Sequence, residues 1–202
     1  MPQSSTMEFG HIRRMKDIRF PHEVAVILPG EYFLSETPMV VYTVLGSCIS
    51  VCLRDPQAGV GGMNHFMLAA PSGSHDNDNW SESGRYGSYA MEMLINGILN
   101  RGGHRKRLEA KVFGGGKIYD GSMDVGAKNA AWALDYLQQE GMPAVKADVG
   151  DVCPRKVYYF TNTGKVLMKK LDRVQSQKIV QQERQYESTL KKEPVAGEVT
   201  LF

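Results

Sequence analysis

Cys48 and His65 are of the residue types that together perform nucleophilic catalysis, and each lies beside or within an apolar run. The two runs, Ile49–Leu53 and Val60–Leu68, are separated by Asp55-Pro56-Gln57-Ala58-Gly59. Asp, Pro and Gly supply the local hydrogen bonding and the backbone angles of a tight turn. We therefore predict a β-hairpin over these residues.

The predicted hairpin brings the two reactive side chains together. If its arms fold back about Gln57, Cys48 comes to lie opposite His65 or Phe66. Directly opposed residues of an antiparallel pair have Cβ atoms roughly 4.5–5.5 Å apart, so a thiol and an imidazole can share a proton there. The prediction depends on the assumed turn, because a slip of one residue would direct the imidazole to the other face.

Short strands and two helices surround the hairpin. Helical spacing predicts helices over Tyr86–Asn100 and Val125–Glu140, which glycines then end. Further strands are predicted over Glu23–Leu28, Tyr32–Leu34, Met39–Leu45, Leu108–Phe113, Val145–Val149, Arg155–Phe160 and Val166–Leu171. Hairpins outnumber crossovers, which favours an α+β fold, an α/β layered sandwich with mixed and antiparallel sheets.

The chain of 202 residues, 42% of them apolar, is long enough for one sizeable core. We predict a mobile polar arm over residues 1–22, a folded domain over 23–172 and a polar C-terminal tail over 173–202 with helical tendency. The apolar end of this tail, Val199, Leu201 and Phe202, could attach to its own domain or to a partner. The breaker-rich segment Ala70–Arg85 is predicted to be a loop.

Charge and hydropathy exclude several classes of protein. The net charge is +2 with both signs interspersed, which favours neither nucleic acid nor an anionic membrane as a partner. The N-terminus has no apolar stretch of the kind found in secretory signals. The uncharged run Thr37–Leu53 falls short of the ~20 apolar residues of a spanning helix. We therefore expect a protein that is not inserted in a membrane and is located in the cytoplasm.

The three cysteines are expected to be reduced, because their number is odd and no export signal precedes them. Cys48 and Cys52 are too far apart along one extended strand to form a disulfide. Cys52 and Cys153 are interpreted as structural or incidental. A zinc site formed by the three cysteines and His65 is an alternative, but the spacing lacks paired short-range ligands.

The glycine run Gly114-Gly115-Gly116-Lys117 follows a predicted buried strand. It lacks the spacing of a nucleotide-binding loop and the Ser or Thr that follows the lysine there. The glycines are better explained by a close approach of two backbone segments beside the site.

The motifs around the reactive pair resemble those of one known family. The chain is similar to the chemoreceptor glutamine deamidases of the CheD family, and the resemblance spans roughly residues 25–171. The matching motifs are residues 43–48 (TVLGSC), 61–68 (GGMNHFML), 85–92 (RYGSYAME), 112–115 (VFGG), 155–157 (RKV) and 163–167 (TGKVL). The loop Gly150–Pro154 departs from the family pattern, in which Gly-Gly is expected before the Arg-Lys-Val strand.

This resemblance implies a protein-glutamine deamidase of bacterial chemotaxis whose fold is related to that of cysteine deamidase toxins. Cys48 would be the nucleophile, His65 the general base and acid, and Thr43 the residue that orients His65. The distance from Thr43 to the cysteine varies by a residue among relatives. The implied substrates are glutamines on the cytoplasmic helices of methyl-accepting chemoreceptors, and a CheC-type phosphatase is a possible partner.

The residue chemistry agrees with this activity. A neighbouring imidazolium favours the thiolate, which attacks the carboxamide carbon of a glutamine. Backbone N–H groups near Ser47 and Cys48 are candidates for holding the oxyanion, and Gly46 and Asn64 are further candidates for residues at or near the site. Hydrolysis of the thioester then releases glutamate, and no metal or organic cofactor is required.

Two alternatives remain open. The same residues could hydrolyse a glutamyl methyl ester, since the acyl chemistry is shared. A non-catalytic adaptor, which only binds receptor helices or a CheC-type phosphatase, would have no need of the Cys48 thiol.

Overall fold

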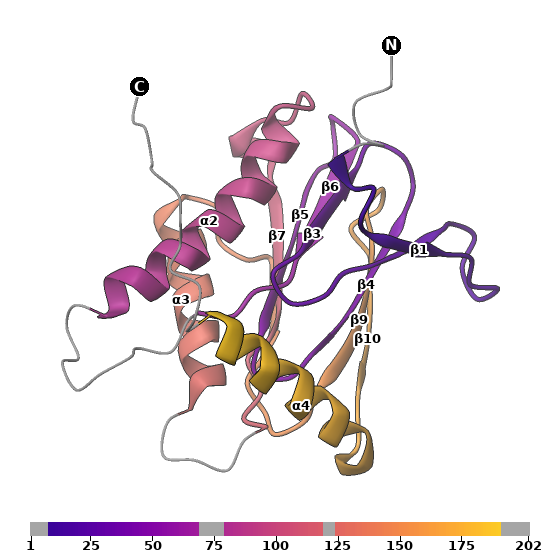
Figure 1. Cartoon of the computed structure of the whole chain (residues 1–202). Helices are drawn as coiled ribbons and strands as arrows, with labels where there is room; N and C mark the ends of the chain where they lie inside the picture. Colours follow the sequence, from indigo (N-terminus) through magenta and orange to yellow (C-terminus); the bar gives the residue numbers. More distant parts are fainter. Residues whose placement is uncertain (1–7, 69–78, 119–123, 191–202) are drawn as a thin grey trace.

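The computed structural model describes residues 8–68, 79–118 and 124–190, which form two five-stranded sheets packed face to face (Figure 1). The first sheet has the order β1 (Arg13–Met15), β2 (Val24–Val26), β4 (Val40–Leu45), β9 (Arg155–Phe160) and β10 (Val166–Lys170). The second has the order β3 (Tyr32–Ser35), β6 (Val60–Asn64), β5 (Ile49–Asp55), β7 (Glu109–Gly114) and β8 (Lys146–Val149). Each sheet contains one parallel pair, β2 with β4 and β7 with β8. The predicted α+β sandwich is confirmed.

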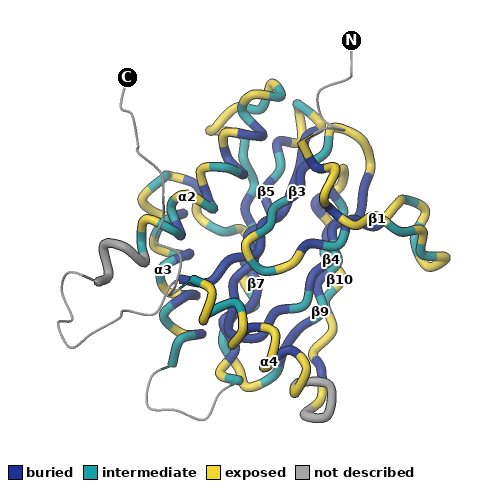
Figure 2. The backbone as a smooth tube through the Cα atoms, viewed as in Figure 1, coloured by how far each residue is buried: buried dark blue, intermediate teal, exposed yellow. Residues whose placement is uncertain are grey.

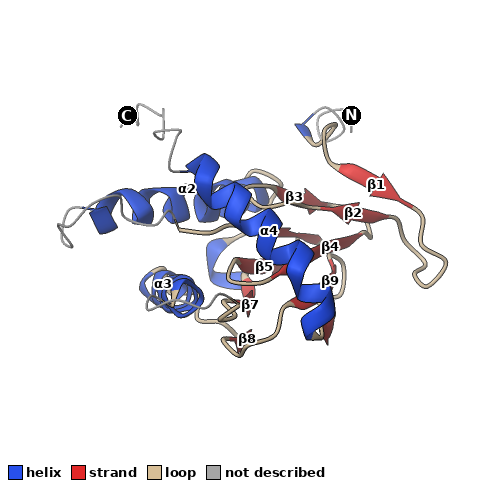
Figure 3. Ribbon diagram, turned by 60° about the horizontal axis from the view of Figure 1, so that its bottom comes forward, coloured by secondary structure: helices blue, strands red, loops and turns tan. Residues whose placement is uncertain are grey.

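Helices cover one outer side of the sandwich and one of its ends. α2 (Asn79–Leu99) and α3 (Val125–Gln139) pack on the second sheet, away from the first. The third helix, α4 (Arg173–Leu190), crosses the end of the sandwich at which β4 and β6 finish and β5 begins (Figure 3). Because α2 starts at Asn79, the final part of the loop predicted over Ala70–Arg85 is helical instead, and residues 69–78 lie outside the described ranges.

The second sheet forms the centre of the core, because the first sheet covers one of its faces and α2 and α3 cover the other. All residues of β6 are buried, as are all but one of β5 (Figure 2). The two sheets are also joined by a hydrogen bond, since the buried Tyr159 hydroxyl of β9 donates to the Leu53 carbonyl of β5 (3.1 Å). This packing leaves the strand ends beneath α4 as the place where loops from both sheets meet.

The predicted hairpin is confirmed, with a different register. Asp55 pairs with Val60 across the turn, and continuing that register pairs Ile49 with Phe66. Cys48, which precedes Ile49, therefore lies opposite neither His65 nor Phe66. The offset from the first of these predicted pairings is two residues, so Cys48 and His65 still share one face and become diagonal neighbours.

The N-terminal segment is not a mobile arm in the part that the structure describes. Phe9 and Ile12 are buried in the core, and Phe9 packs its ring against Tyr32 and Phe33 with centroids 5.3 and 5.1 Å away. Residues 13–15 pair as β1 with β2. The prediction is wrong here because a few apolar side chains anchor the segment through contacts with strands far along the chain, and Phe20 adds to these by packing against Tyr158 and Phe160 of β9.

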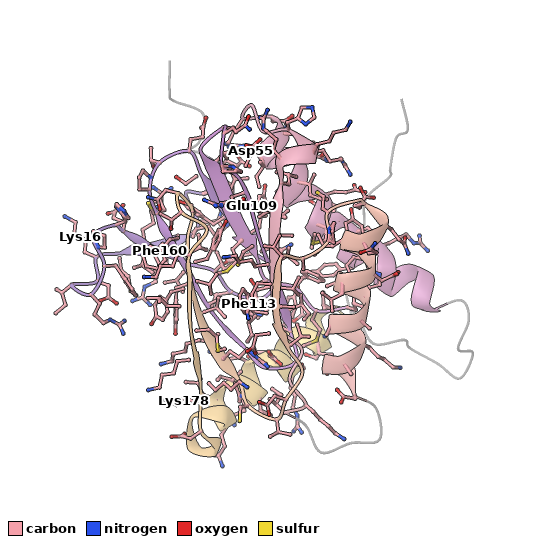
Figure 4. The ribbon with its side chains drawn as sticks, turned by 180° about the vertical axis from the view of Figure 1, so that it is seen from behind. Lys16, Asp55, Glu109, Phe113, Phe160 and Lys178 are labelled. Carbon is pink, nitrogen blue, oxygen red and sulfur yellow. The ribbon has the colours of Figure 1, made fainter. Side chains whose placement is uncertain are left out.

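The C-terminal segment is attached to the domain as well. Within α4, Ile179 and Glu183 are buried against the end of the sandwich, whereas most of the residues between them are exposed. Figure 4 shows Lys178 of α4 at the opposite end of the molecule from Asp55 in the hairpin turn. The apolar residues Val199, Leu201 and Phe202 lie outside the described ranges.

Candidate active site

The predicted nucleophile Cys48 lies in the link Gly46–Cys48, where the chain leaves β4 of the first sheet and enters β5 of the second. Its three carbonyl oxygens all accept hydrogen bonds from neighbouring segments. The pairs are Gly116 N with Gly46 O (2.7 Å), the Asn129 side-chain amide with Ser47 O (2.9 Å), and Gly115 N with Cys48 O (2.8 Å). The carbonyl groups thus fix the link in place, and its N–H groups are directed towards α4.

The glycine run after β7 permits these contacts, as predicted. Gly114 has φ +114°, and a Cβ there would lie 2.1 Å from the Cys48 carbonyl oxygen. Any side chain at position 114 would therefore push the nucleophile away, in addition to the backbone strain of positive φ. The run supports the link and shows no feature of a phosphate-binding loop.

His65 directly follows β6, and backbone hydrogen bonds on both of its sides fix its position. Its N–H donates to the Glu31 carbonyl (2.9 Å), and its carbonyl accepts from Gly30 N–H (2.8 Å). The side chain is buried, at 2% exposure. An imidazole nitrogen lies within 4.8 Å of the Cys48 sulfur, so the structure brings the predicted nucleophile and base together.

The contacts of Thr43 in β4 indicate which nitrogen of His65 carries the proton. The Thr43 hydroxyl donates to the Ile27 carbonyl (2.8 Å) and lies 2.7 Å from His65 Nδ1. A hydroxyl has a single proton, so it must accept from Nδ1–H. Nε2 then carries the lone pair, and within the described ranges this buried atom has no hydrogen-bond partner. Nε2 is therefore the nitrogen available to the thiol.

The asparagine that contacts the link is not the one that the sequence suggests. Asn64 is next to His65 but points to the opposite face of the strand, because successive strand residues alternate. Its amide accepts from Val51 N–H (2.8 Å) and donates to the Ala90 carbonyl of α2 (3.1 Å), so it braces the hairpin rather than the site. Asn129 of α3 is the asparagine that contacts the nucleophile link, and its side-chain oxygen also accepts from Leu68 N–H (3.1 Å).

Glu183 of α4 completes the site from the other side of the link. Its Oε1 accepts from the N–H groups of Gly46 (2.7 Å) and Cys48 (3.3 Å), and its Oε2 accepts from the N–H (2.8 Å) and hydroxyl (2.7 Å) of Ser47. The three successive N–H groups form a concave anion site, which includes the two predicted as oxyanion donors. Nothing in the local sequence marks Glu183, which is one glutamate among many polar residues of α4.

Burial and charge keep the pair neutral in this arrangement. Burial lowers the pKa of His65 to about 3, although the Ile27 carbonyl acts in the other direction. Burial and the adjacent Glu183 carboxylate raise the pKa of the Cys48 thiol. The ion pair of thiolate and imidazolium is thus disfavoured while α4 covers the site.

The sequence of the chain is similar to those of known proteins. A family profile described as CheD chemotactic sensory transduction matches residues 67–170. A protein of Thiobacillus denitrificans named "Probable chemoreceptor glutamine deamidase CheD" is 51% identical over 189 residues, 92% of this chain and 93% of the relative. The chain belongs to the CheD family. Proteins with the same name from Methylobacillus flagellatus and Rhodopseudomonas palustris are 48% and 44% identical, over 92% and 100% of this chain and 93% and 94% of their own lengths.

In this CheD family member, one thiol, one imidazole and one carboxylate converge, which is also a donor set that could hold a metal ion. The contacts of Glu183 argue for a different use, because each of its oxygens already accepts two hydrogen bonds from the link. Among the described residues, the cluster includes neither Cys52 nor Cys153, which the zinc alternative would require. All three cysteines are free.

The same contacts exclude Glu183 as the residue that orients the base. Nδ1 of His65 is engaged by Thr43, and the carboxylate lies where a reacting acyl group would be held. The arrangement can therefore activate a thiol and bind an anion beside it, which are the requirements of acyl transfer. Within the described ranges, no helix of this CheD chain combines the length and the apolar character needed to cross a membrane.

Proposed function

We propose that this chain is a protein-glutamine deamidase that converts glutamines of chemoreceptors to glutamates, with Cys48 as nucleophile and His65 as base. The observation that carries the proposal is the glutamate carboxylate bound by the N–H groups of the link, beside a thiol and an imidazole. A site that binds this group is complementary to the acyl part of the reaction that the relatives' names describe.

The first half of the reaction forms a thioester. His65 Nε2 takes the proton of the Cys48 thiol, and the thiolate sulfur bonds to the carboxamide carbon of the glutamine. The oxyanion that develops is stabilised by N–H groups of the link, each worth on the order of 2.7–4 kcal/mol in other enzymes. The carbon–nitrogen bond then breaks as the imidazolium donates its proton, and ammonia leaves.

The second half of the reaction hydrolyses the thioester. Nε2 removes a proton from water, whose oxygen bonds to the acyl carbon, and the carbon–sulfur bond breaks to give glutamate. The imidazolium returns its proton to the sulfur. Thr43 keeps Nδ1 protonated in both halves, so that Nε2 is the atom that moves the proton. A glutamyl methyl ester would follow the same path with methanol as the leaving group.

The proposed substrate places the enzyme in the cytoplasm, where the signalling helices of chemoreceptors lie. A glutamine on such a helix can reach the site at the strand ends, where loops of both sheets meet. A CheC-type phosphatase is a further proposed partner. The adaptor alternative differs in one respect, because an adaptor would function equally well without the Cys48 thiol.

Mass spectrometry of a purified receptor cytoplasmic fragment tests the proposal. Incubation with the wild type should add about one mass unit at particular glutamines, because NH₂ is replaced by OH. Cys48→Ala should abolish the conversion. Cys52→Ala removes another buried thiol of the same region and should retain it. Conversion that survives Cys48→Ala, or is absent with the wild type across several receptors, would contradict the proposal.

A further inference from the structure

The carboxylate that fills the site belongs to the chain itself and is presented by a helix. It is chemically the same group as the product of glutamine deamidation. It occupies all three N–H groups of the link and the Ser47 hydroxyl, which leaves those donors unavailable to a substrate. A Cβ at Gly46 would lie 2.9 Å from both Glu183 oxygens, so the link fits this carboxylate closely.

The site is closed while α4 is in place. The Cys48 side chain is fully buried and His65 is 2% exposed. A glutamine side chain must approach the sulfur within bonding distance, which requires that Glu183 leave first. The buried Nε2 of His65, unpartnered among the described residues, marks the position to which the leaving group and water must gain access.

One face of α4 packs against the domain, and among its described side chains this face includes Ile179, Glu183, Tyr186 and Leu190. Ile179, Glu183 and Tyr186 follow helical spacing, so they share that face. Tyr186 forms a hydrogen bond with Tyr86 of α2, and a Cβ at Gly30 would lie 2.8 Å from its hydroxyl oxygen. The contact thus includes a glutamate with one apolar residue a turn before it and one aromatic residue a turn after it.

The opposite face of α4 is exposed among the residues whose burial the structure describes. Residues 181, 182, 184 and 185 are exposed. A cavity of about 430 Å³ lies beside the first half of the helix, lined by Val44, Lys156 and Leu171 of the sandwich and by Ile179 and Gln182 of α4. When a helix packs through one face and is flanked by a cavity, its release exposes the apolar area of that face alone.

We infer that α4 is a product-like occupant of the substrate site, and that a substrate helix takes its place with a glutamine where Glu183 lies. This inference rests on the proposed function. The surface beneath α4 is then the docking site for a helix that carries an apolar residue four positions before the glutamine and an aromatic or apolar residue three positions after it. The chain's own helix competes with that substrate, and deamidation requires that α4 be released.

The most direct test converts α4 from product to substrate. In Glu183→Gln, the carboxamide lies beside Cys48, and we expect residue 183 to gain about one mass unit as its NH₂ is replaced by OH. The rate should not change on dilution, because the reaction is intramolecular. Gln181, Gln182 and Gln185 are internal controls that should stay unchanged, and the double variant Glu183→Gln with Cys48→Ala should show no conversion.

A second variant tests the competition directly. Glu183→Ala removes the bound carboxylate, and if the closed arrangement holds nine molecules in ten or more, deamidation of a receptor fragment and alkylation of Cys48 should both accelerate about tenfold or more. Gln181→Ala, an exposed truncation on the same helix, should leave both rates unchanged. Wild-type rates in Glu183→Ala, with no conversion in Glu183→Gln, would overturn the inference even if the wild type deamidates the receptor. Failure of the proposed function differs, because then no variant with Cys48 would convert a receptor glutamine.

Discussion

The Thr43 hydroxyl lies 2.7 Å from Nδ1 of His65 and joins a strand of the first sheet to the residue that follows a strand of the second. Its own proton is donated to the Ile27 carbonyl. The hydrogen bond therefore fixes both the orientation and the tautomer of the imidazole, as the role proposed for Thr43 requires.

Thr43→Val keeps the shape of the side chain but leaves Nδ1–H buried without its partner. We expect kcat/KM for receptor deamidation to fall on the order of 10²-fold, because the base loses its alignment. The free energy of unfolding should fall by about 1–3 kcal/mol. Thr43→Ser retains the hydroxyl and should recover most of the activity. An active Thr43→Val enzyme with an unaltered pH profile would show that the hydroxyl does not orient the base.

The depressed pKa of His65, about 3, makes stability depend on pH. The unfolded chain has the ordinary value of about 6.5, so between these values it binds a proton that the folded chain does not. The stability that the neutral His65 contributes is complete above pH 6.5, and it is lost as the pH falls from 6.5 towards 3. We expect the wild type to lose about 2 kcal/mol of unfolding free energy between pH 7 and pH 5 that His65→Gln does not lose. Urea unfolding at both values measures it, and equal losses in the two proteins would refute it.

Asn129 connects α3 to the nucleophile link through two hydrogen bonds, to Ser47 O and from Leu68 N–H. Asn129→Ala should displace the link and lower kcat for the receptor fragment by about 10²-fold, with a loss of about 2 kcal/mol in unfolding free energy. Gln138→Ala, an exposed truncation on the same helix, is the matched control and should change neither quantity. If Asn129→Ala lost stability but kept its kcat, the residue would be structural only.

Asp55 stabilises the hairpin from the end opposite the site. Its side chain accepts from the N–H groups of Gln57 (2.8 Å) and His104 (2.8 Å) and from the Arg107 guanidinium (2.8 Å). Asp55→Ala leaves these donors unpaired and should cost about 3 kcal/mol of unfolding free energy, whereas Gln57→Ala should cost less than about 0.5 kcal/mol.

Activity separates Asp55 from Asn129. Because Asp55 lies far from α4 (Figure 4), the folded Asp55→Ala enzyme should keep kcat within about twofold when assayed well below its melting temperature. Thermal melts and initial rates on the same samples provide the comparison. A large fall in kcat at full folding would show that the turn transmits its geometry to the site.

The sequence predicts the hairpin well because its turn is encoded locally, by Asp55 and Gly59 within five residues of each other. The pairing of Cys48 with His65 follows from that turn, although the register is offset by two residues. The offset preserves the shared face, so the chemical conclusion survives an error in the geometry. For Asn64 the prediction fails, because this residue is next to His65 in sequence but its side chain points to the opposite face of the strand.

Asn129 and Glu183 could not be predicted in the same way. They contact the link from 82 and 136 residues away, and each is a polar residue on a helix with no local feature of a site. The buried position of Phe9 is similar, because its partners Tyr32 and Phe33 are reached only after the sheet has formed. Such contacts arise from the packing of layers, which local propensities do not encode.

The position of the link between β4 and β5 has a consequence for evolution and design. The proposed nucleophile Cys48 belongs to the crossing between sheets, and the proposed base His65 follows a strand of one sheet. Thr43, proposed to orient that base, belongs to the other sheet, and Asn129 comes from the helical layer. A relative slide of about 1 Å between layers would misalign all four and cost about 10²-fold in rate, while changing little in folding free energy. The catalytic rate is therefore more sensitive than the melting temperature to changes in packing between the layers of this fold. Conservative substitutions between the sheets should be screened by rate.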